Sequence, residues 1–82
     1  MDWANKYPRR WNRWHSDDWR GLVVVDDQGH YFYNAWQGPI EEVLLAAPSL
    51  PAAQHAAEQM VQKSGHRCTA RCSFWIPDPH LD

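Results

Sequence analysis

Four residues near the C-terminus have side chains that bind metals or form disulfides: Cys68 and Cys72, with His66 and His80 close by. The segment that carries both cysteines alternates apolar and polar residues, which is typical of a half-buried strand. On a strand, the two cysteines would lie about 13 Å apart. A disulfide needs Cα atoms within about 7 Å, and zinc needs both thiolates within about 2.3 Å of the ion. We therefore expect core thiols that face a helix and no metal or cofactor, with a metal site as the alternative.

The adjacent residues His15, Ser16 and Asp17 are the residue types of a hydrolase triad. Triad members come from separate elements, and neighbours in sequence rarely converge on one reacting atom. A turn in which the short polar side chains cap backbone amides is the favoured interpretation. The chain also has only four glycines, which leaves little room for a phosphate-binding loop. We expect no catalytic residues and no enzymatic activity.

The first 20 residues mix aromatic rings with arginines. The rings of Trp3, Tyr7, Trp11 and Trp14 follow spacings of four, four and three residues, which match one face of a helix. Because proline is tolerated only in the first turn, the pattern predicts a helix over Pro8 to Trp14.

This aromatic and basic segment, residues 1–18, has three competing interpretations. Tryptophan and arginine are enriched in protein interfaces, and they also stack on unpaired bases. Alternatively, the rings cover the second face of a sheet, or form a homodimer contact. The predicted partner-binding residues are Trp3, Arg9, Arg10, Trp11, Arg13 and Trp14.

The middle of the chain predicts a β-hairpin over residues 19–36. A run of β-branched residues ends at Asp26, a glycine follows at Gly29, and an aromatic run begins shortly after. Both faces of the first hairpin strand are apolar, so something besides a helix must cover one of them. Residues Ile40 to Ala47 fit either a short helix or a strand.

An amphipathic helix is predicted over residues 49–65. Ser49 is a plausible N-cap, apolar residues recur at helical spacing, and Gly65 is suited to a left-handed C-cap. A strand over residues 66–76 and a tail over 77–82 follow. Residues 1–82 therefore predict one α+β domain in which a helix covers one face of a three-stranded antiparallel sheet, ordered β-β-α-β. The last strand is expected beside the first hairpin strand.

Length and charge limit the possible functions. The 82 residues have room for one core, and the net charge of −2 argues against binding duplex nucleic acid through overall positive charge. Five basic and three acidic residues fall within residues 1–20, whereas three basic and seven acidic residues follow. No apolar run is long enough for a membrane helix, and the N-terminus lacks the pattern of a signal peptide. We expect a cytoplasmic protein.

In length, aromatic content and lack of a catalytic motif, the chain resembles the compact proteins that phages and mobile elements encode, of which anti-CRISPR proteins are the best-known class. The resemblance implies a non-enzymatic, stoichiometric inhibitor that binds a host protein or protein complex, as a monomer or homodimer. A module that binds single-stranded nucleic acid is the alternative function.

Overall fold

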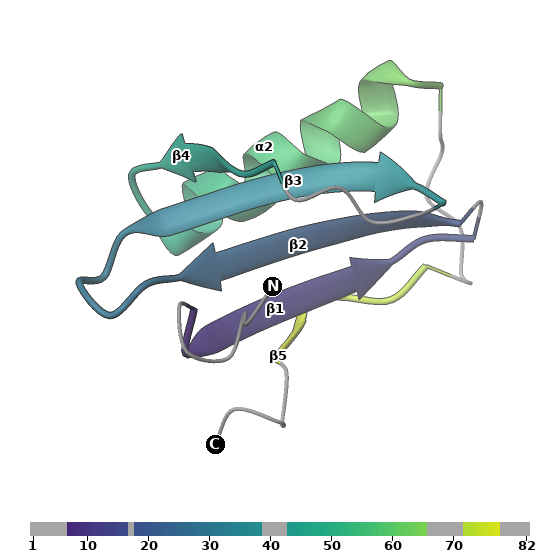
Figure 1. Ribbon diagram of the computed structural model, residues 1–82. Helices are drawn as coiled ribbons and strands as arrows, with labels where there is room; N and C mark the ends of the chain where they lie inside the picture. Colours follow the sequence, from purple (N-terminus) through teal and green to yellow (C-terminus); the bar gives the residue numbers. More distant parts are fainter. Residues whose placement is uncertain (1–6, 17, 39–42, 66–71, 78–82) are drawn as a thin grey trace.

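The computed structural model describes residues 7–16, 18–38, 43–65 and 72–77, and these form one antiparallel sheet with a helix on one face (Figure 1). The sheet order is β4-β3-β2-β1-β5. The elements are β1 (Arg9–Trp14), β2 (Trp19–Val25), β3 (Tyr31–Gln37), β4 (Leu45–Ala47), α2 (Leu50–Lys63) and β5 (Ile76–Pro77). The α+β class is confirmed. The prediction of three strands is wrong, because five are present among the described residues.

The N-terminal segment is a strand, so the predicted helix over Pro8 to Trp14 is wrong. β1 pairs with β2 from Arg9 opposite Val25 to Trp14 opposite Arg20. A helix of this length is marginal by itself, whereas pairing satisfies the backbone groups along the edge of β2. The tertiary contact thus overrides the helical spacing of the aromatic rings.

The predicted hairpin is confirmed as β2 and β3, which pair from Trp19 opposite Gln37 to Val25 opposite Tyr31. At its tip, the Asp26 carboxylate accepts hydrogen bonds from the backbone N–H groups of Gln28 (3.0 Å) and His30 (2.8 Å). Gly29 has φ of +84°, a conformation that favours glycine. In the ambiguous segment, residues 45–47 form β4 against β3, and residues 39–42 lie outside the described part.

The predicted helix is confirmed as α2. The Ser49 hydroxyl accepts a hydrogen bond from the Ala52 N–H at 3.2 Å, which caps the N-terminus. Ala53, Ala57 and Val61 repeat every four residues and are buried against the sheet. The helix covers β2, β3 and β4, as the ribbon also shows. Its small side chains let the helix approach the sheet closely.

The C-terminal strand was only partly predicted. Residues 66–71 and 78–82 lie outside the described part, and residues 72–75 are not a strand. Ile76 and Pro77 pair with Asn12 and Trp11 of β1. The predicted place beside the first hairpin strand is wrong, because β1 already occupies that edge.

The sheet has apolar clusters on both faces. On the helix side, Val23 and Val25 pack with Trp11 and Ala53. On the opposite face, Leu22 and Val24 pack with Tyr7 and Trp36. Tyr7 thus supplies part of the cover that the second face was predicted to need. Within the described ranges, no helix is long and apolar enough to cross a membrane.

Candidate functional site

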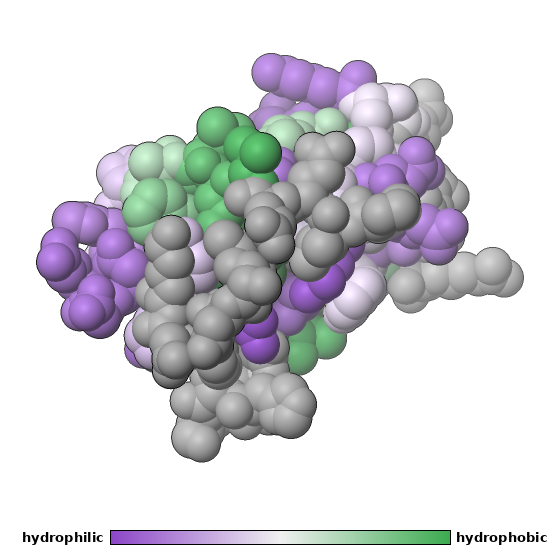
Figure 2. Space-filling view, viewed as in Figure 1, coloured by the Kyte–Doolittle hydropathy of each residue, from purple (hydrophilic) through white to green (hydrophobic). Residues whose placement is uncertain are grey.

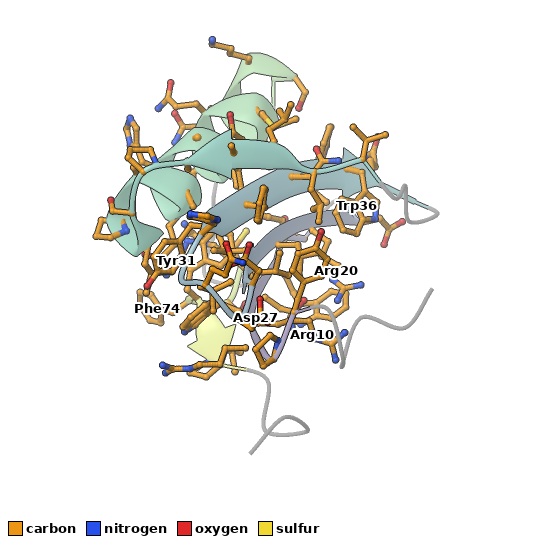
Figure 3. All side chains as sticks on the ribbon, turned by 60° about the vertical axis from the view of Figure 1, so that its left-hand side comes forward. Arg10, Arg20, Asp27, Tyr31, Trp36 and Phe74 are labelled. Carbon is orange, nitrogen blue, oxygen red and sulfur yellow. The ribbon has the colours of Figure 1, made fainter. Side chains whose placement is uncertain are left out.

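The strand splits the predicted binding residues between the two faces of the sheet. Successive side chains of a strand point to opposite faces, so Arg9, Trp11 and Arg13 share the helix side. Arg10 and Trp14 share the other face, where Figure 3 labels Arg10 near Arg20 and Trp36. Trp3 lies outside the described residues. The six residues therefore do not form the single surface that helical spacing predicted.

Trp11 belongs to the core. It is 8% exposed and packs with Val23, Val25 and Ala53. The Tyr31 ring centroid lies 6.4 Å away, and the Arg9 guanidinium lies 5.4 Å from the Trp11 ring centroid. Arg9 is exposed at this edge. Trp11 supports the fold, and the Arg9 guanidinium lies over its ring.

Arg13 ties three elements together. Its Nη1 forms an ion pair with Glu58 of α2, and its Nε donates to the Ser73 carbonyl at 2.9 Å. The same Glu58 oxygen accepts a hydrogen bond from the Trp75 indole at 2.8 Å. Glu58 thereby links α2, β1 and the C-terminal segment 72–77. Because its charge is matched within the protein, Arg13 has a structural role.

Trp14 is the exposed tryptophan among the described members of the predicted set, with 52% of its surface accessible. The Arg20 guanidinium lies 4.6 Å from its ring centroid and 5.6 Å from that of Trp36. Arg20 also donates to Asn12 Oδ1, from Nε at 3.1 Å and Nη2 at 2.5 Å. We call Asn12, Trp14, Arg20 and Trp36 the arginine–tryptophan cluster.

The arginine–tryptophan cluster is preorganised. An arginine loses much rotamer freedom when it is immobilised at an interface, but here Asn12 and two rings already hold the guanidinium in place. Trp36 is buried, whereas Trp14 presents its ring outward. The cluster can therefore offer a fixed aromatic surface beside a fixed cation.

Sequence reasoning missed Asn12, Arg20 and Trp36. The available signal was strand alternation: with residues 9–14 read as a strand paired to residues 19–25, Trp14 lies opposite Arg20 and Asn12 lies on the same face. The aromatic rings of this segment also follow helical spacing, and that pattern favoured a helix over a strand. The cluster forms only when β1 pairs with β2 and β2 pairs with β3.

The other candidate chemistry is not assembled among the described residues. His15 is buried and its backbone N–H donates to the Trp19 carbonyl at 2.9 Å, while Ser16 is exposed in the turn. The Cys72 thiol, half-buried, donates to the Ser16 hydroxyl at 3.9 Å, and Cys72 is not on a strand as predicted. His66, Asp17, Cys68 and His80 lie outside the described part. No group of three or more potential metal ligands occurs in the described ranges.

The hairpin tip carries a perturbed carboxyl group. Hydrogen bonding from the His30 backbone N–H is the main cause that lowers the pKa of Asp26, and the Gln28 N–H contributes in the same direction. The His30 imidazole Nδ1 lies 3.4 Å from the carboxylate. These contacts are those of an exposed turn, so we assign Asp26 a structural role.

Comparison with known proteins finds no relative of this chain. No family model matches it, and neither a curated protein nor a solved structure matches it. The function must therefore be argued from the candidate site and the surfaces around it.

Proposed function

We propose that the chain is a non-enzymatic binding protein that acts in the cytoplasm as a stoichiometric inhibitor of a host protein complex. Its resemblance to small inhibitors of phage or mobile-element origin, of the anti-CRISPR kind, motivates the class of partner. The observation that carries the proposal is the half-exposed Trp14 ring held beside the Arg20 guanidinium. Tryptophan and arginine are the residues most enriched among interface hot spots.

The proposed contact contains fewer of the predicted residues than the sequence analysis suggested. Trp14 and Arg20 form its centre, Arg10 shares their face, and Arg9 stays a predicted contact at the opposite face of β1. Trp11 and Arg13 support it from within, because one is buried and the other is ion-paired. Trp3 remains a prediction.

A module that binds single-stranded nucleic acid is the second candidate function. A tryptophan beside an arginine can stack on an unpaired base, which favours this alternative. Such modules also track the phosphate backbone with a positively charged groove. Here Glu58 neutralises Arg13, Arg20 is held by Asn12 and two rings, and the net charge is −2. These observations favour a protein partner.

Affinity purification from host lysate tests the proposal. The tagged chain is applied with and without nuclease, and retained proteins are identified and quantified. We expect a defined protein in equimolar amount that survives nuclease treatment. Retained nucleic acid that nuclease removes, together with loss of any protein, would support the alternative function.

The Trp14→Ala variant locates the contact within the same experiment. Truncation of a hot spot should weaken binding by about 2 kcal/mol or more, with a melting temperature near that of the wild type. Leu45→Ala is the matched control, because Leu45 is 44% exposed at the opposite edge of the sheet. Retention of the partner by Trp14→Ala at wild-type strength would remove the cluster from the interface.

A further inference from the structure

The edge of the sheet formed by β4 has the features of a strand-pairing surface. β4 is the last strand on this side, and no described strand pairs with its outer edge. An unpaired edge presents backbone N–H and C=O groups to which another extended strand can bond. Val43 is 61% exposed and Leu45 is 44% exposed, and Figure 2 shows apolar surface over β4 and the residues before it. This edge therefore offers backbone hydrogen-bonding groups and apolar side chains together.

The sequence of this edge lacks the residues that usually prevent edge strands from pairing. Residues 43–50 contain no charged side chain, and their one proline, Pro48, follows the strand. Charged residues and prolines within an edge strand are the common protection against pairing with another chain. The opposite edge differs, because β5 is two residues long and its Pro77 has no N–H to donate. Of the two edges of the described sheet, β4 is the one suited to a partner strand.

A second copy of β4 complements this edge. In an antiparallel pair related by a two-fold axis between the two Ala46 residues, Leu45 of each chain lies beside Ala47 of the other. Both side chains are on the helix side, since they pair within the chain with Tyr33 and Tyr31. A large residue thus meets a small one on this face, and the two Ala46 methyl groups meet on the other face. The pairing brings no like charges together, so the edge is self-complementary.

We propose that the chain forms a two-fold homodimer in which the β4 strands of two copies pair antiparallel and continue the sheet. β4 has three residues, so the interface is smaller than the roughly 1,600 Å² of a standard one, and the dissociation constant lies above about 1 μM. Two strands, β3 and β2, separate β4 from β1, so the dimer does not use the arginine–tryptophan cluster. The inference therefore does not rest on the proposed function.

The purified wild-type chain, without any host protein, supplies the first test. Sedimentation velocity from about 1 μM to about 500 μM should show a monomer at the lowest concentration and an increasing fraction of dimer. Hydrogen exchange at the highest concentration should slow at the β4 amides more than at those of residues 72–76, because pairing protects the edge. A chain that stays monomeric, or a dimer in which exchange at β4 does not slow, would overturn the proposal.

Two charge variants at Ala46 test the register of the pairing. Ala46 is exposed, so Ala46→Lys and Ala46→Glu should each fold. Each variant alone should dimerise at least tenfold more weakly than the wild type, because two like charges then lie opposite each other at the axis. An equimolar mixture should recover a mixed dimer, because lysine then lies opposite glutamate. Ile76→Lys, at the opposite edge, is the matched control and should leave dimerisation unchanged.

The outcomes separate the possible occupants of the edge. Wild-type dimerisation by both charge variants would refute pairing at Ala46, and so would a mixture of folded variants that stays monomeric. If either variant fails to fold by circular dichroism, the exchange data on the wild type decide. A monomeric wild type whose β4 amides become protected only when a host protein is added would show that a strand of that protein pairs with the edge, and would refute the homodimer.

Discussion

Trp11 and Trp14 lie three residues apart on β1, yet they belong to different environments. Trp11 packs between β2 and the start of α2, in a cluster of valine and alanine side chains. Trp14 lies on the other face, half-exposed, against a guanidinium that an asparagine holds. The helix-side face thus uses its large rings for packing. The opposite face places polar groups between its rings, which makes a surface suited to recognition.

The largest expected effect is that of removing Trp11. Trp11→Ala should cost about 3–5 kcal/mol of folding stability, because the ring is 8% exposed and the small residues around it cannot close the cavity. That loss would unfold much of a domain this small. Trp14→Ala on the same strand should cost less than about 1 kcal/mol, since half of its ring already contacts water.

Urea denaturation of both variants, followed by circular dichroism, measures this contrast. Equal losses of stability would break the distinction between the two faces of β1. A larger loss for Trp14→Ala would reverse it, and would assign the arginine–tryptophan cluster to the core.

The next largest loss of stability is expected where the Trp75 ring packs against Gly21 on the helix side of the sheet. A Cβ added at Gly21 would lie 2.7 Å from Trp75 Cη2, closer than carbon atoms approach in folded proteins. Gly21→Ala should therefore cost about 1–3 kcal/mol as the indole is pushed from its place. The double variant Gly21→Ala with Trp75→Phe supplies the control, because the smaller ring leaves room for the added methyl group. Thermal melts should show that Gly21→Ala lowers the melting temperature less when Trp75→Phe is already present. An equal decrease in both backgrounds would show that the Trp75 ring does not limit the space at Gly21.

Glu58 should give an intermediate effect, because two donors share one of its oxygens. Glu58→Ala leaves both the Arg13 guanidinium and the Trp75 indole without this acceptor, at a cost of about 1–2 kcal/mol. Glu58→Gln keeps an acceptor for the indole and removes the charge that pairs with Arg13, so its loss should be smaller. If urea titrations gave Glu58→Gln a loss as large as that of Glu58→Ala, the indole hydrogen bond would add nothing beyond the ion pair.

The elements with strong local signals were predictable from the sequence. The hairpin turn at Asp26 to Gly29 and the helix from its Ser49 cap both carry residues whose conformational preferences match the structure. Local residue preferences are enough to specify these elements. Their boundaries were therefore predicted to within two residues.

The elements that depend on the choice of strand partner were not predictable. Residues 9–14 have a helical spacing of aromatic rings, but they form a strand that pairs with the edge of β2. That choice displaced the C-terminal strand to the outside of β1, where it pairs over Ile76 and Pro77. The strand also places Trp11 and Trp14 on opposite faces, so Trp14 was the one residue of the arginine–tryptophan cluster that could be named from sequence.

The smallest expected effect lies at the hairpin tip, away from both faces compared above. The backbone N–H of His30, with that of Gln28, holds the pKa of the Asp26 carboxyl below its ordinary value of 3.8. A carboxyl group with a lowered folded-state pKa stabilises the fold above its unfolded pKa and loses that contribution as the pH falls through the folded pKa.

Asp26→Asn keeps an oxygen acceptor for both N–H groups but carries no charge. The wild type should therefore melt slightly higher than this variant at about pH 7, and the two melting temperatures should converge as the pH falls through the lowered folded-state pKa of Asp26. Because the group lies at the surface, solvent screens the interaction, and the difference should be smaller than the effects expected for the tryptophan, glycine and glutamate variants. A difference that stays constant with pH, or widens in acid, would mean that the tip contributes through its turn geometry alone and that the charge of Asp26 adds nothing to the fold.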